Sequence, residues 1–280
     1  MLRRGAGLCR LALLGLMAAT AAPACEARFP AGGLPGRSSV APFINPPPNL
    51  AHENWAPVGV RMEFHAGFAE ATDAYGHNIM GRLQDMRLLT IHVTQAGSDR
   101  TTCPAEALLP EDEVFEDIAP RIADLDGDGM PEVIVVQSDL RLGARLAIYD
   151  RRARLIAATP PIGQPHRWLA PLGADDLDSD GRIEIAYVDR PHLARVLRVW
   201  RFEGGHLTEV ASAEGHTNHR IGDESISGGV RYCDGRAEIV TLDPAWRRIQ
   251  VTTLSDGQLE TRDHAALRGS QSLEAALLCR

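Results

Sequence analysis

Residues 124–136 read DLDGDGMPEVIVV, with four acidic side chains in nine positions and a β-branched run directly after them. The segment returns at 176–188 as DLDSDGRIEIAYV. Each acid of the first copy recurs 52 positions later, in the pairs Asp124/Asp176, Asp126/Asp178, Asp128/Asp180 and Glu132/Glu184. Self-similarity at one fixed spacing indicates a chain built from structural repeats.

The repeat extends beyond the acidic segment. Leu155 in ARLIAA recurs as Leu207 in GHLTEV and as Leu259 in GQLETR. A weaker acidic copy, YCDGRAEIVTL at 232–242, keeps Asp234 and Glu238 but lacks the two leading acids, and DMRLLTIHV at 85–93 marks an earlier unit. We therefore predict four units, at roughly 64–115, 116–167, 168–219 and 220–271.

The segments inside each unit are typical of β-strands. EVIVVQ, LAIYD and VLRVWRF are short and β-branched or alternating, and FEGGHL and LSDGQL are typical of hairpin turns. Between residues 60 and 268 no long segment has a helical period. Repeats of this length predict an all-β fold, a β-propeller of four to five blades, in which small sheets bury their faces by stacking on one another.

With these residues the chain resembles the FG-GAP or VCBS-type repeat family, found in the propeller of integrin α chains and in many exported bacterial proteins. DLDGDGMPEVIVV and DLDSDGRIEIAYV carry the resemblance, which covers about 116–260. It implies a propeller with calcium held at positions one, three, five and nine of the acidic segment. Integrin-like members have seven units, whereas four are visible here, so the blade number stays open between four and five.

The acidic segments also predict a cation site from their own chemistry. Carboxylates at alternate positions of a tight loop turn toward one centre, and the glycine at position six permits the positive φ that bends the backbone around it. A flexible cage of hard oxygen ligands suits calcium better than magnesium. The alternative is a plain polar turn, and in the third copy we expect Asp234 and Glu238 to be structural. The predicted calcium ligands are Asp124, Asp126, Asp128 and Glu132, then Asp176, Asp178, Asp180 and Glu184.

The start of the chain predicts export. Residues 1–24 have the basic start, short apolar run and small residues of a signal peptide. A Pro/Gly-rich leader would follow at 25–60 and the repeat domain at 61–280. We therefore expect a periplasmic or secreted protein with no transmembrane span, and a lipid anchor on Cys25 is the alternative. Loss of three arginines with the signal peptide moves the formal net charge from −8 to −11, which disfavours nucleic-acid partners.

Four cysteines remain after the signal peptide, and in an exported protein an even number suggests two disulfides. Of the three possible connectivities we prefer the one that pairs Cys233 with Cys279, because this bond would hold the end of the chain on the last unit. The four are Cys25, Cys103, Cys233 and Cys279.

A second group of candidate residues lies in loops between units. TNHRIGDESISGG at 217–229 carries a histidine and an arginine, and two further histidines precede strands in the same way; as ligand-binding candidates these are His77, His166, His219 and Arg220. The arginine-rich stretch 190–201 is interpreted as protection of an exposed strand face. We expect a binding or scaffolding module for an unknown protein or carbohydrate ligand. The alternative is a propeller enzyme (hydrolase, lyase or quinone-dependent dehydrogenase) with its site on the central face.

Overall fold

The computed structural model describes residues 62–95 and 103–280. The predicted signal peptide, the leader and Cys25 lie outside these residues. All the described residues belong to one unit of the chain, Pro35–Arg280. No helix among them is long and apolar enough to cross a membrane.

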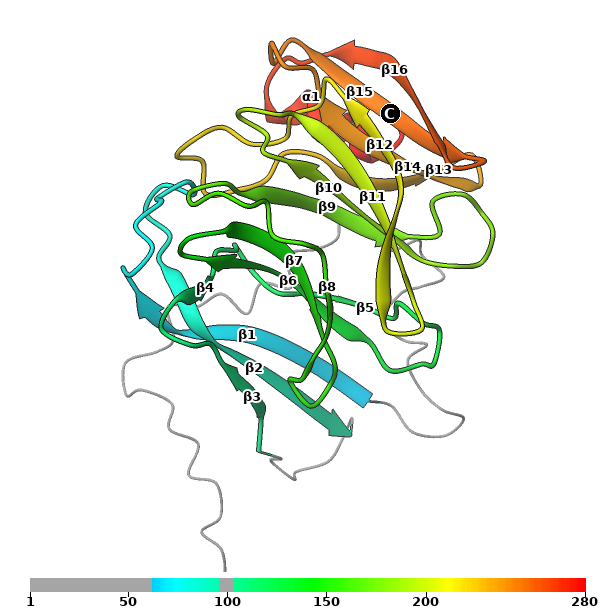
Figure 1. Cartoon of the computed structure of the whole chain (residues 1–280). Helices are drawn as coiled ribbons and strands as arrows, with labels where there is room; N and C mark the ends of the chain where they lie inside the picture. Colours follow the sequence, from blue (N-terminus) through cyan, green and yellow to red (C-terminus); the bar gives the residue numbers. More distant parts are fainter. Residues whose placement is uncertain (1–61, 96–102) are drawn as a thin grey trace, which may run out of the picture. The chain divides into compact units, whose positions relative to one another are not determined.

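The described residues form an all-β structure with one short helix (Figure 1), as the sequence predicts. The first eight strands are β1 (Met62–Thr72), β2 (Asp85–Gln95), β3 (Ala105–Leu108), β4 (Glu113–Phe115), β5 (Arg121–Ala123), β6 (Glu132–Asp139), β7 (Gly143–Tyr149) and β8 (Leu155–Ala158). The last eight are β9 (Leu169–Asp175), β10 (Glu184–Asp189), β11 (Val196–Glu203), β12 (His206–Glu214), β13 (Gly229–Cys233), β14 (Arg236–Leu242), β15 (Arg248–Ser255) and β16 (Gln258–Ala266), followed by α1 (Ser270–Leu277).

Three successive parts of the chain form antiparallel meanders of four strands. Strands β9–β12 and β13–β16 are each a separate sheet in which every strand pairs with the next. Strands β5–β8 pair in the same sequential way, but β4 also pairs with β6 and so joins them to β1, β2 and β3 in one larger sheet. The tight turns between strands take the residues that hairpins need, for example Gly204 and Gly205, which have positive φ values of 58° and 79°.

Alternate residues of each central strand point to opposite faces, so each meander contributes to two cores. On β6, Ile134 and Val136 belong to one buried cluster, whereas Val133 and Val135 belong to another. The second strands of the next two meanders follow the same rule. Ile185 and Tyr187 share the cluster of Ile134, while Ala186 and Val188 share a cluster with Ala237 and Ile239 of β14. The three meanders therefore pack face to face through continuous apolar layers.

The end of the chain is fixed to the last meander. A disulfide joins Cys233, the last residue of β13, to Cys279 just after α1, which confirms the preferred pairing. The buried side chains of Ala276 and Leu277 pack with Val240 and Leu242 of β14. Cys103 is also disulfide-bonded.

Candidate functional site

The first acidic segment is the loop between β5 and β6. Its backbone N–H groups are bound by its own carboxylates: Asp124 accepts hydrogen bonds from Gly127 (2.9 Å) and Gly129 (3.1 Å). Glu132, the first residue of β6, accepts one from the Leu125 N–H at 2.9 Å. Gly127 and Gly129 have φ values of 74° and 84°, which glycine adopts at little cost. The loop is therefore folded around the carboxylates of Asp124 and Glu132.

Three of these four acids offer oxygen atoms that all lie within 4.8 Å of one another, namely Asp124, Asp126 and Glu132. Asp128 is outside this group, and its Oδ1 accepts the Met130 N–H at 2.7 Å. Burial raises the pKa of Glu132 to about 7; the Leu125 N–H opposes this, and the negative charges of the neighbouring aspartates add to it. A cation at this centre would relieve both the repulsion and the cost of burial.

The second acidic segment, between β9 and β10, has a similar backbone pattern, in which one of the two donors to the first aspartate differs. Asp176 accepts hydrogen bonds from Asp180 and Gly181, each at 3.0 Å, and the Leu177 N–H donates to Glu184 at 3.0 Å. Its group of three converging carboxylates is Asp176, Asp178 and Glu184. Among the described residues these two groups are the only clusters of three or more potential metal-ligating side chains.

The second loop differs from the first because it contains arginines. Arg201 of β11 donates to Glu184 (2.6 Å) and Asp178 (2.9 Å), and its side chain is only 14% exposed. Arg182 binds Asp180 through two hydrogen bonds and, as the main cause, lowers the pKa of that carboxyl to about 2. The sequence suggested that the arginines of 190–201 protect an exposed strand face. Arg201 instead pairs with the acids of this loop.

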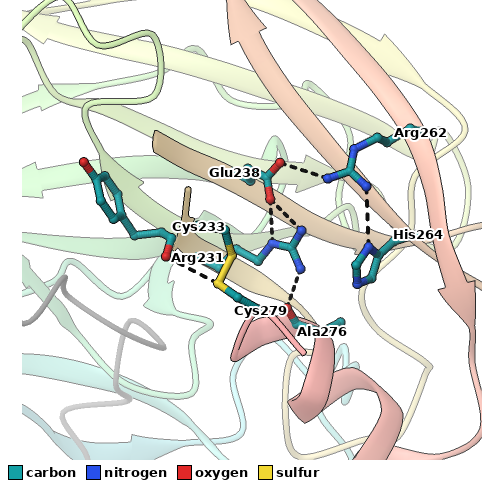
Figure 2. Close-up of a disulfide and its surroundings, with 8 residues drawn as sticks. Arg231, Cys233, Glu238, Arg262, His264, Ala276 and Cys279 are labelled. Carbon is teal, nitrogen blue, oxygen red and sulfur yellow. Dashed lines mark hydrogen bonds and ion pairs between the residues drawn. A yellow bond between two sulfur atoms is a disulfide. The ribbon is translucent and has the colours of Figure 1, made fainter. Parts of the chain in front are cut away.

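The third, decayed copy is neutralised by arginines alone. Glu238 of β14 pairs with Arg231, its direct neighbour on β13, with an Nε–Oε2 distance of 2.8 Å. Arg262 of β16 approaches its other oxygen at 3.0 Å, as Figure 2 shows. Arg231 and Glu238 are both buried, whereas Asp234 is exposed in the turn.

The candidate histidines His77 and His166 lie together. Their rings stack with centroids 5.1 Å apart, and His77 Nδ1 lies 2.5 Å from an Oε1 atom of the buried Glu116. Tyr75 joins them, because its hydroxyl accepts the His166 main-chain N–H at 2.6 Å. Ser138 donates to the second oxygen of Glu116. Burial raises the pKa of Glu116, and the hydrogen bond with His77 opposes this.

His219 belongs to the same neighbourhood through Trp168. The Trp168 ring lies 4.8 Å from that of His219, and its Nε1–H donates to the main-chain oxygen of Glu116 at 2.8 Å. His192 is 3.1 Å from His219, and burial lowers its pKa to about 4. The structure thus brings together three of the four candidates.

Arg220, the fourth candidate, lies elsewhere, with its guanidinium 4.0 Å above the ring of Trp246. Sequence reasoning missed Glu116 and His192. The repeat gave no signal for Glu116, since the equivalent positions 52 and 104 residues later are Trp168 and Arg220.

No protein-family model matches the sequence, and no curated protein matches it. Partial matches among solved structures include the exotype rhamnogalacturonan lyase YesX, at 16% identity and a TM-score of 0.38 over 62% of this chain and 40% of that one. Rhamnogalacturonan lyase YesW has 14% identity and a TM-score of 0.36 over 66% and 44%. The rhamnogalacturonan lyase PL11 of Bacillus licheniformis has 14% identity and a TM-score of 0.38 over 74% and 48%. The chain thus spans less than half of each of these enzymes, and TM-scores below 0.5 assign it no activity.

Proposed function

We propose that the chain is an exported repeat protein of the VCBS/FG-GAP type, a β-propeller of four to five blades that acts as a binding or scaffolding module at the cell envelope. The stacking of three four-stranded meanders supports the propeller, because small sheets packed in series are how propeller blades share their cores. The disulfide between Cys233 and Cys279 supports export, since such bonds persist in oxidising compartments.

Calcium is the cofactor of this proposal, and its role is structural. The observation that carries it is the pair of converging carboxylate groups, each at the entry of the second strand of a meander and 52 positions apart. The residues fit the ion, because carboxylate oxygens on a flexible loop are the donors that calcium takes. Asp124, Asp126 and Glu132 would hold the ion in the first loop. When bound, the ion would hold this loop against β6, whose side chains pack into two buried clusters.

Thermal unfolding with calcium and with chelator tests this proposal. Calcium at about 100 times its dissociation constant would add about 2.7 kcal/mol, a rise of several degrees in melting temperature. The double variant Asp126→Asn/Asp178→Asn keeps the side-chain shape and should lose this rise. Asp234→Asn, in the turn of the decayed copy, is the matched control and should keep it. An unchanged melting temperature in the wild type, or an equal rise in the double variant, would disprove the calcium role.

The histidine cluster favours a second candidate function, an enzyme or a binding site for a carbohydrate. The specific observation is the contact of His77 Nδ1 with the buried Glu116 carboxylate. A carboxylate that accepts the Nδ1–H of an imidazole leaves Nε2 as a proton acceptor, which is the arrangement of a general base and its orienting group. His77 keeps 14% of its side-chain surface exposed, so a ligand can reach it.

Affinity electrophoresis through gels that contain individual neutral or acidic polysaccharides tests this second candidate, with release of oligosaccharide as a parallel assay. If the wild type is retarded in a gel or releases oligosaccharide, His77→Ala should do neither. His206→Ala, at an exposed position of β12, serves as the control. Equal behaviour of His77→Ala and the wild type would exclude His77 from the site.

A further inference from the structure

A glutamate stands at the start of the second strand in three successive meanders. Glu132 opens β6, Glu184 opens β10, and Glu238 lies near the start of β14. All three are buried, with 6%, 0% and 4% of their surface exposed. A buried carboxylate needs a counter-charge. Each of the three glutamates therefore needs a positive charge beside it.

The three repeats differ in the charged side chains that surround this glutamate. Glu132 converges with the carboxylates of Asp124 and Asp126, and no arginine of the described residues forms an ion pair with it. Glu184 has one arginine, Arg201. Glu238 has two arginines and no converging aspartates around it.

The geometry of Arg201 is that of a cation at the centre of the second loop. Arg201 and Glu184 are direct cross-strand partners of β11 and β10. The guanidinium reaches Asp178 at 2.9 Å and Asp180 at 3.1 Å as well as Glu184, so it contacts three of the four predicted calcium ligands. Its planar array of donors suits several carboxylates at once.

The first loop has no such side chain. The residue 52 positions before Arg201 is Tyr149, and its hydroxyl donates to Gln137 at 2.9 Å, away from the acids. Within the described part of the chain, no arginine forms an ion pair with Asp124, Asp126, Asp128 or Glu132, whereas Arg201 forms one with Glu184. Tyr149 lies opposite Val133 rather than Glu132, so β7 brings no cation to the first loop, whereas β11 brings Arg201 to the second.

We propose that Arg201 takes the place of the metal ion in the loop 176–184, so that the chain binds one calcium ion strongly, in the loop 124–132, rather than two. This inference rests on the proposed calcium function and assigns it to one loop. An ion entering the second loop would have to displace the guanidinium or bind against its charge, and it would find Asp180 already bound by Arg182. In the decayed third copy the two leading acids are missing, and Arg231 and Arg262 neutralise the glutamate.

Isothermal titration of the full mature chain with calcium chloride tests the proposal by stoichiometry. We expect one strong ion per wild-type chain and a second at least about tenfold weaker, since a guanidinium opposes it within a few ångströms. Asp126→Asn should abolish the strong ion, whereas Asp178→Asn should leave it unchanged. These two variants need no change at Arg201 and keep the loop shape.

Removal of the guanidinium provides the converse test. Arg201→Met should raise the stoichiometry to two strong ions, while Arg198→Met, on the same strand but paired with Asp189 and Glu209, should leave it at one. Two ions of equal affinity in the wild type, or a strong ion lost in Asp178→Asn, would overturn this inference while the calcium function stands. No binding in the wild type would overturn the calcium function itself.

Discussion

Trp168 donates its indole N–H to the main-chain oxygen of Glu116, and the two residues are 52 positions apart, one repeat length. Residues at equivalent positions of two successive repeats are thus in direct contact. Trp168 is buried and also packs against His219. The Trp168 side chain therefore contacts both the preceding repeat, through Glu116, and the histidine cluster, through His219.

Replacement of Trp168 by phenylalanine should destabilise the protein. The change removes the indole donor, leaves the Glu116 carbonyl without this partner and opens a small cavity, for a loss of about 1–3 kcal/mol. Urea unfolding measures the loss. Trp246→Phe, at a half-buried position outside the cluster, is the matched control and should cost less. Equal losses in the two variants would mean that the indole N–H contributes nothing specific.

The local part of the structure could be predicted from the sequence. The acidic loops, the β-branched strands and the hairpin glycines act within a few residues of one another, so their patterns determine the backbone there. A closed propeller would depend on the mutual arrangement of all the repeats, which periodicity does not specify. The join between β4 and β6 also lacked a local signal, because it depends on pairing between two repeats.

The partners of the site residues were harder to predict. Arg201 and Glu184 are 17 positions apart and meet only because β10 and β11 pair in one register. Arg182, beside Asp180, fell in the predicted ligand loop but was not recognised as a competing partner for that acid. Glu116 showed no motif of its own, and its contact with His77 joins segments 39 positions apart.

Gly143, the first residue of β7, should not tolerate a side chain. A Cβ atom there would lie 2.2 Å from the main-chain oxygen of Gln164, and the φ of 76° is unfavourable for any other residue. Gly205 has nearly the same φ, 79°, but open space around it. Gly205→Ala should therefore cost about 1 kcal/mol from backbone conformation alone.

Gly143→Ala should cost roughly 1–3 kcal/mol more than this control because the loop that carries His166 must move. Chemical denaturation of both variants gives the difference. If the two glycines prove equally replaceable, the packing of residues 164–167 against this turn is looser than the structure indicates.

Because Arg231 and Glu238 form a buried pair (Figure 2), removal of one charge should destabilise the protein more than removal of both. Glu238→Gln leaves the Arg231 charge buried without its partner and should cost about 3–5 kcal/mol, because desolvation of the arginine is no longer offset. Arg231→Met/Glu238→Leu removes both charges and should cost less than Glu238→Gln. A double-mutant cycle by urea unfolding decides this. A double variant less stable than either single one would show that the pair contributes net stability.

His216 predicts how stability depends on pH. His216 is 1% exposed, its Nδ1 lies 2.8 Å from the Thr241 hydroxyl, and burial lowers its pKa from 6.5 to about 4. The unfolded chain therefore takes up a proton near pH 6.5, but the folded chain does so only near pH 4. The contribution of His216 to stability is fully present above pH 6.5 and is lost as the pH falls toward 4, by up to about 3 kcal/mol.

The difference in unfolding free energy between the wild type and His216→Gln, measured from pH 4 to pH 8, isolates this group. Other titrations cancel in the difference, including those of Asp85 and Glu132, whose raised pKa values act in the opposite direction. Wild-type stability should fall relative to that of the variant as the pH drops from 6.5 to 4. His206→Gln, on the exposed edge strand β12, should run parallel to the wild type. A pH-independent difference for His216→Gln would mean that the folded protein accepts a proton at His216 as readily as the unfolded chain does.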